Sequence, residues 1–254
     1  MKMQSWRRSR IGLLAAAAAC AAGSPARSLV GPASEDRTFA GHVVMVLQRG
    51  VDRAGFCTGV VVAPQAVLTA AHCVTAIKDM RIHYRDDSGK PVLLEVRAVA
   101  THPGYRADAI AKRIVSIDLA LVETQTPLEP RFSPAPLDDS GTVSVGQSLR
   151  IVGYGVGREG QGASAGVLRS APLQVRAPLS AVLLWAEDPN GAGAGGCTGD
   201  SGGPILSGDG AKVLAITTWS AGTGGKRCGA VTQGPLLAPQ RGWIDGVLKG
   251  WGLL

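Results

Sequence analysis

The stretch "GCTGDSGGPIL", residues 196–206, places one acid and one serine among four glycines. Its segment 199–203 matches G-x-S-x-G, the pattern of a strained turn that exposes a serine hydroxyl in one hydrolase fold. In that fold a histidine must follow the serine along the chain. The sequence contains four histidines, and all of them precede Ser201: His42, His72, His83 and His102. Because no histidine follows Ser201, that hydrolase fold is excluded, and the glycines around Ser201 must belong to a different fold.

Two earlier residues are candidate partners for the Ser201 hydroxyl. A serine is a weak nucleophile until a base removes its proton, and the base is usually a histidine oriented by a carboxylate. His72 lies in the apolar run "VLTAAHCV", and Asp118 is the only acid in the run "IDLAL". Because a buried carboxylate without a partner is costly, we expect Asp118 to contact a group that stabilises its charge.

The order His72, Asp118, Ser201 and the surrounding motifs resemble the trypsin/chymotrypsin-like serine protease family, in a bacterial-type exported form. In "FCTGVVVAPQAVLTAAHC", Cys57 lies fifteen residues before His72 and Cys73 follows it directly, as in that family. Further stretches also resemble family motifs: "THPGY" (101–105), "VGYG" (152–155), "CTGDSGGP" (197–204) and "TTWSAG" (217–222). The resemblance covers roughly residue 29 to the C-terminus.

Short β-rich runs alternate with Gly, Pro and Asp-Ser turns over residues 42–219, which is typical of a sandwich or barrel. Only residues 239–248 carry apolar side chains at convincing helical spacing. The resemblance implies an all-β fold of two six-stranded antiparallel Greek-key β-barrels, chymotrypsin-like, with a C-terminal α-helix. We expect a leader at 1–27 and a protease domain at 28–254, with barrels at about 29–130 and about 140–254.

The formal net charge of +7 is concentrated at the start of the chain. Five of the 26 basic residues and no acid lie in residues 1–27, which leaves 21 basic against 19 acidic residues afterwards. This near balance argues against a nucleic-acid partner. The basic start, the apolar run 11–22 and Pro25 indicate an export signal, and the run is too short for a stable membrane insertion.

We therefore expect a monomer exported to the periplasm or the extracellular space after signal-peptide cleavage. Cys20 lies in a poor lipid-attachment box, so lipid anchoring is not expected.

Four cysteines follow the leader, and in an exported chain they favour two disulfides, with three pairings open from their number alone. The resemblance implies the pairs Cys57–Cys73 and Cys197–Cys228. No C-x-x-C or H-E-x-x-H spacing occurs, so neither a zinc site nor any other metal or cofactor is expected.

The resemblance also assigns roles around Ser201. Ser201 would attack a peptide carbonyl, His72 would carry the proton, and Asp118 would orient His72, giving an acyl-enzyme intermediate. The backbone N–H groups of Gly199 and Ser201 would form the oxyanion hole. Asp200 would form an activating ion pair with a new N-terminal ammonium at Leu29, released by cleavage.

The substrate pocket that the resemblance implies is formed by two short stretches of the C-terminal half. Its floor would be Gly195, six residues before the nucleophile, with Gly196 beside it. Because no carboxylate stands there, a preference for Arg or Lys is not expected, and small or apolar side chains are favoured. The remaining wall residues would be Thr198, Thr218, Trp219 and Ser220.

These features favour a secreted serine endopeptidase that acts on polypeptides, with protein inhibitors as further partners. Two alternatives remain at this point. The first is a non-proteolytic binding or adhesion module on the same fold, although such members usually lose a triad residue. The second is an esterase that uses the same triad.

Overall fold

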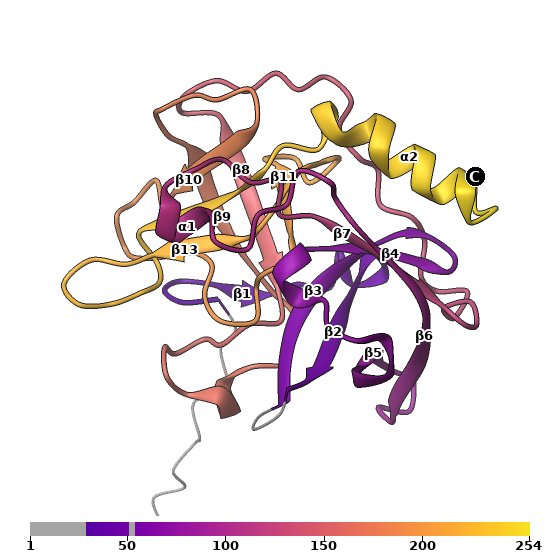
Figure 1. The fold of residues 1–254 in the computed structure, drawn as a ribbon. Coiled ribbons are helices and arrows are strands. Elements are labelled where there is room, and N and C mark those ends of the chain that lie inside the picture. The colour runs from indigo at the N-terminus through magenta and orange to yellow at the C-terminus, as the bar shows by residue number, and fades with distance from the viewer. Residues whose placement is uncertain (1–28, 51–53) are drawn as a thin grey trace, which may run out of the picture.

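A closed barrel of six antiparallel strands forms the N-terminal half of the computed structural model, which describes residues 29–50 and 54–254. The strands follow the order β2-β3-β4-β7-β6-β5 around the barrel (Figure 1). Alternate side chains point inward, as Met80, Ile82 and Tyr84 do in β5. The bounds are β2 Val43–Arg49, β3 Ala54–Ala63, β4 Ala66–Thr69, β5 Met80–Arg85, β6 Pro91–Thr101 and β7 Ala120–Thr124.

An eight-stranded sheet forms the C-terminal half, in the order β12-β11-β8-β9-β10-β14-β13, with β1 paired to β9. A bridge between Ala215 and Leu236 joins β12 to the residue after β14, so the sheet curls back on itself. The expected fold class is confirmed, with eight strands in the second half where six were expected. The bounds are β1 Ser34–Glu35, β8 Ser148–Gly153, β9 Arg169–Val175, β10 Leu183–Glu187, β11 Pro204–Ser207, β12 Val213–Ile216, β13 Trp219–Ala221 and β14 Val231–Pro235.

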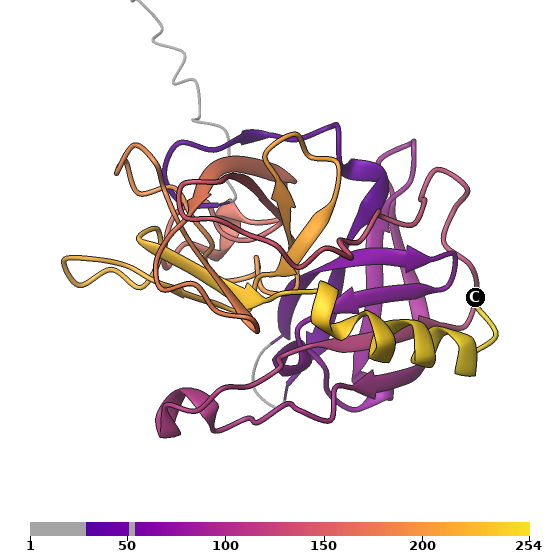
Figure 2. The ribbon, with the colours of Figure 1, turned by 90° about the horizontal axis from the view of Figure 1, so that it is seen from above.

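Two α-helices are present in the described residues. α2, Arg241–Gly250, follows a 3₁₀ turn at Ala238–Gln240 and corresponds to the helix expected at 239–248. α1, Ala109–Lys112, was not expected because one turn is too short to show helical periodicity. Figure 2 shows α1 standing out from the body at the end of its loop. The other 3₁₀ turns are Ala40–His42, Ala71–Cys73, Ile77–Asp79 and Gly162–Ser164.

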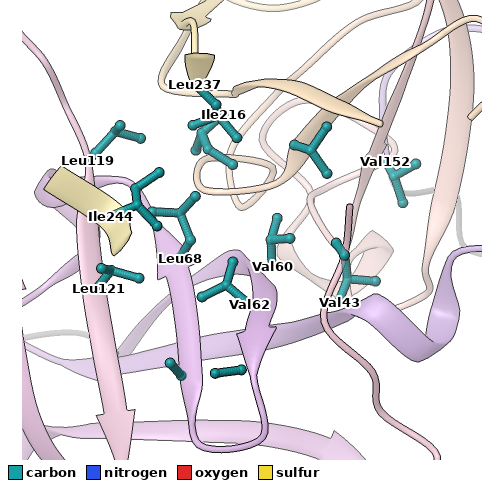
Figure 3. Close-up of a cluster of buried hydrophobic side chains, with 14 of the residues drawn as sticks. Val43, Val60, Val62, Leu68, Leu119, Leu121, Val152, Ile216, Leu237 and Ile244 are labelled. Carbon is teal, nitrogen blue, oxygen red and sulfur yellow. The ribbon is translucent and has the colours of Figure 1, made fainter. Parts of the chain in front are cut away.

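One buried apolar cluster joins the two halves and α2 (Figure 3). Val60 and Leu68 come from the barrel, Val152 and Ile216 from the second sheet, and Ile244 from α2. Burial of such side chains is worth about 1.5–3 kcal/mol each, so the cluster fixes how the halves meet.

The described structure contains the two expected disulfides. Cys57 bonds to Cys73 and Cys197 bonds to Cys228. The predicted leader, including Cys20, lies outside the described residues. Within the described part of the chain, no helix has the length and apolar character needed to cross a membrane.

Candidate active site

His72 and Asp118 lie at the same end of one strand pair. β4 and β7 are antiparallel, with Thr69 opposite Ala120. His72 follows Thr69 by three positions and Asp118 precedes Ala120 by two, so both lie just beyond the same end of this strand pair. His72 Nδ1 lies 2.7 Å from Asp118 Oδ2, and the His72 backbone N–H donates to Asp118 Oδ1 at 2.9 Å. Two contacts to one carboxylate hold the imidazole in a fixed orientation, and they supply the partner that the sequence required for Asp118.

Ser201 is supplied by the C-terminal half and attached to the N-terminal barrel. The Thr58 N–H in β3 donates to the Ser201 carbonyl oxygen at 2.8 Å, and the Thr58 hydroxyl donates to the Gly199 carbonyl at 2.9 Å. Ser201 and His72 line the same cavity, of about 500 Å³. Among the described residues, the Ser201 hydroxyl makes no hydrogen bond to the His72 ring. The evidence that the two side chains are close is that they line the same cavity. A hydrogen bond between a catalytic serine and histidine is often long when no substrate is bound.

Two glycines beside Ser201 have backbone conformations that other residues rarely adopt. Gly199 has φ 94° and Gly202 has φ 82°. A Cβ on Gly199 would lie 2.3 Å from the Phe56 ring, and one on Gly202 would lie 2.1 Å from the Thr58 carbonyl oxygen. In the described structure, the N–H groups of Gly199 and Ser201 donate to no protein acceptor, which leaves both available to an oxyanion.

Asp200 is fully buried beneath this turn. Its Oδ1 accepts the Gly155 N–H at 2.8 Å and its Oδ2 accepts the Cys197 N–H at 2.9 Å. Burial raises the pKa of Asp200 to about 7, and the two N–H donors oppose this shift only in part. The carboxylate therefore orders the loop, and no cation of the described residues lowers its pKa.

The first described residues run against the segment before Cys197. Leu29 is fully buried with φ 61°, in the left-handed region that leucine rarely adopts, and Val30 forms a bridge with Gly195. The segment expected to carry the activating N-terminus is thus packed beside the nucleophile loop. The expected ion pair between Leu29 and Asp200 stays a prediction.

The cavity at Ser201 contains only part of the pocket expected from the sequence. Thr198, Thr218, Trp219 and Ser220 line it, together with Thr217 and Cys228. Gly195 and Gly196 do not line it, and both are buried. The pocket therefore ends before the two glycines that were expected at its floor.

Thr232 explains this shallow floor. It lies in β14, is 1% exposed, and its Oγ1 accepts the Gly196 N–H at 3.0 Å. A Cβ on Gly195 would be 3.2 Å from that oxygen, and one on Gly196 would be 3.3 Å from Thr217 Cγ2. The two threonine side chains thus occupy the space that the glycines leave. Sequence reasoning missed both, because the register that places Thr232 opposite Ser220 is visible only in the sheet.

One group of potential metal ligands occurs in the described residues, namely Cys57, His72 and Cys73. The two sulfurs are bonded to each other, so neither can act as a thiolate ligand. His72 alone makes no metal site.

Comparison with known proteins identifies relatives of this architecture. The family model described as Trypsin matches residues 32–235. Trypsin of Saccharopolyspora erythraea is 29% identical, over 74% of this chain and 86% of the relative. Glucanase inhibitor protein 3 of Phytophthora infestans is 26% identical, over 79% of this chain and 81% of the relative.

A solved structure shares the fold. The inactivated protease paralogue S-I1 of the scabies mite superposes with a TM-score of 0.67 at 22% identity, over 85% of this chain and 99% of that chain. With the family model covering most of the described residues, the chain belongs to the trypsin family of serine proteases.

Proposed function

We propose that this protein is a serine endopeptidase that cleaves polypeptides through His72, Asp118 and Ser201. The observation that carries the proposal is the hydrogen-bonded His72–Asp118 pair, whose His72 lines one cavity with Ser201. Proteins with this fold include a glucanase inhibitor protein and an inactivated protease paralogue, so the fold by itself does not carry the proposal. This chain retains all three residue types in the required order.

In the proposed reaction, Ser201 Oγ attacks the peptide carbonyl carbon while His72 Nε2 takes the hydroxyl proton. Asp118 stabilises the imidazolium that forms. The Gly199 and Ser201 N–H groups bind the oxyanion. His72 then gives the proton to the leaving amine as the C–N bond breaks, which leaves an acyl group on Ser201. Water attacks this ester with His72 as base, and the free acid and the Ser201 hydroxyl result.

Pairing of the substrate backbone with β13 is part of the proposal. β13 ends the second sheet and pairs only with β14, so its other edge is open to an added strand. A substrate bound along Trp219–Ala221 would present the side chain before the scissile bond to the cavity bounded by Thr217 and Ser220. Because Thr232 fills the space beneath, this pocket suits a small side chain.

Two further parts of the proposal concern processing. The predicted signal at 1–27 and the two disulfides support export of a domain at 28–254 to an oxidising compartment. Cleavage before Leu29 would supply an ammonium group beside the loop of Asp200. It would also remove the peptide bond that defines the left-handed φ of Leu29.

The proposal is tested with a fluorophosphonate probe and unstructured peptides on the wild-type chain and Ser201→Ala. We expect covalent labelling and peptide cleavage by the wild type, and neither by the variant, because the probe requires an activated serine. Gly162→Ala is the control, since a Cβ there meets nothing within 4 Å. Labelling without cleavage of any peptide but with ester hydrolysis would indicate an esterase. Failure of the chain starting at Leu29 to label would contradict the proposal and favour a binding module.

A further inference from the structure

The sequence contains a single asparagine, Asn190, and a glycine follows it directly. Asparagine is one of the chemically labile residues, because a backbone nitrogen can attack its side-chain amide. A following glycine favours this attack, since it has no side chain to shield its nitrogen and adopts many backbone conformations. The one asparagine of the chain therefore stands in the sequence context that most favours its own modification.

Asn190 and Gly191 lie in the turn after β10, and both are exposed. Gly191 has φ 65°, in the left-handed region that glycine adopts readily, and a Cβ on it would meet no atom within 4 Å. Among the described residues, none forms a hydrogen bond with the Asn190 side chain. The amide group and the neighbouring backbone nitrogen are therefore both open to solvent.

The nitrogen that would attack the Asn190 amide is held by one long hydrogen bond. The Gly191 N–H donates to the Asp188 carbonyl oxygen at 3.2 Å, which is the upper end of the usual range. This bond closes an exposed turn, where water is available as a competing acceptor. Exposed turns open locally at a small cost in free energy, so the nitrogen becomes free without unfolding of the whole protein.

The turn also holds the segment that leads to the nucleophile loop. The Asp188 carboxylate is buried and accepts the N–H groups of Asn190 and Ala194, each at 2.9 Å. The next residue after Ala194 is Gly195, which forms the bridge with Val30. Because the bond to Ala194 spans the peptide link that follows Asn190, a change in the length of that link disturbs this support.

We propose that Asn190 is a site of spontaneous deamidation in the folded protein. The Gly191 nitrogen forms a bond to Asn190 Cγ, the bond from Cγ to the side-chain nitrogen breaks, and ammonia leaves with the proton of the Gly191 N–H. A five-membered succinimide ring results. Water then adds to one of the two ring carbonyl carbons and breaks its bond to the ring nitrogen, which gives aspartate or isoaspartate. The inference does not depend on the proposed endopeptidase function, since no residue of the catalytic cavity takes part.

The two products change the turn in different ways. Both add a negative charge to a turn that already contains the buried Asp188 carboxylate, and like charges repel. Isoaspartate in addition lengthens the main chain by one carbon atom at position 190. That atom lies within the spans closed by the hydrogen bonds from Gly191 and Ala194 to Asp188. The isoaspartate form therefore loses support for the segment before Gly195.

The test follows the mass of the protein during incubation in mildly alkaline water labelled with heavy oxygen. We expect a gain of about three daltons in the wild type, one from replacement of the amide by a carboxyl group and two from the label, located at Asn190 by peptide mapping. Asn190→Gln is the matched variant and should gain no mass there, because its longer side chain requires a six-membered ring. Gln161, which is exposed and also followed by a glycine, is the internal control and should stay unmodified.

Incubation in urea is the positive control, because the Gly191 nitrogen is free in the unfolded chain. A mass gain in urea with none in the folded wild type would overturn the proposal, since the fold would then protect Asn190. The isoaspartate form is next separated by ion exchange. We expect it to melt about 2–4 °C below the unmodified protein, with Asn190→Asp, which adds only the charge, between the two. An isoaspartate form that melts together with the unmodified protein would overturn the expected effect on the turn.

Discussion

At the scale of single residues, Thr232 determines the depth of the proposed pocket. Its methyl group lies 3.5 Å from the position of a Cβ on Gly196, and its hydroxyl accepts the Gly196 N–H. We expect the wild type to cleave after alanine in preference to leucine, and Thr232→Gly to shift this ratio towards leucine by at least tenfold. One methylene group in an apolar pocket is worth roughly 10–200-fold in discrimination. The ratio is measured with matched peptides.

Thr217→Val is the matched control for this prediction. The Thr217 hydroxyl is buried without a hydrogen-bond partner, so valine keeps the volume of the side chain and removes an unsatisfied group. The ratio between alanine and leucine peptides should not change in this variant. A wild type that cleaves equally well after both residues would show that Thr232 does not limit the pocket.

The sequence predicted the candidate triad but not the shape of the pocket, and the reason is physical. His72, Asp118 and Ser201 each stand in a local motif whose residue types already imply their chemistry. Thr232 lies in no such motif. Its effect on the depth of the pocket depends on the pairing of β14 with β13 and on the hydrogen bond from the Gly196 N–H, and neither is visible in the sequence. Gly195 and Gly196 were expected at the pocket floor, and neither lines the cavity, because the sequence does not show the side chains that cover them.

At the scale of elements, the Cys197–Cys228 bridge joins the nucleophile loop to the segment before β14 across 31 positions. Loop closure of this length is worth about 3–4 kcal/mol. We expect Cys197→Ser/Cys228→Ser to lose that much free energy of unfolding in urea and to lose most peptidase activity, because both cysteines line the catalytic cavity.

The Cys57→Ser/Cys73→Ser variant serves as the comparison. Its disulfide closes a loop with a sequence separation of 16, so we expect it to lose about 3 kcal/mol of the free energy of unfolding. A variant of the Cys197–Cys228 pair that unfolds at the same urea concentration as the wild type would contradict the expectation.

Whether a helix could be predicted from the sequence depended on its length. α2 has ten residues and a clear apolar stripe, whereas α1 has four residues and no such stripe.

At the scale of the whole molecule, we expect Asp200 to couple the start of the chain to the active site. In a chain that extends upstream of Leu29, its pKa of about 7 exceeds the ordinary value of 3.8. Folding then favours the protonated acid. The contribution of Asp200 to the free energy of unfolding is therefore complete below pH 4. It falls by roughly 1.4 kcal/mol per pH unit as the pH rises to 7. An ammonium at Leu29 would lower this pKa and remove the loss.

We therefore expect a chain that starts at Leu29 to gain stability, between pH 5 and 8, over one that starts at Arg27, and to be far more active. Urea unfolding at each pH and peptide cleavage at neutral pH measure the two effects. Asp200→Asn is the control, in which the two starts should behave alike. Parallel stability curves and equal activities of the two wild-type chains would exclude activation by a new N-terminus.

The position of α2 has a consequence for the stage of synthesis at which the proposed site can form. Ile244 and Leu248 of α2 pack in one cluster with Leu68 of β4 and Leu121 of β7 (Figures 1 and 3). β4 ends shortly before His72, and β7 begins shortly after Asp118. α2, which follows both residues in the chain, thus supports the His72–Asp118 pair. A polypeptide that has not yet been extended as far as α2 lacks this support. We therefore expect the His72–Asp118 pair, and any activity that depends on it, to form only after α2 has been synthesised.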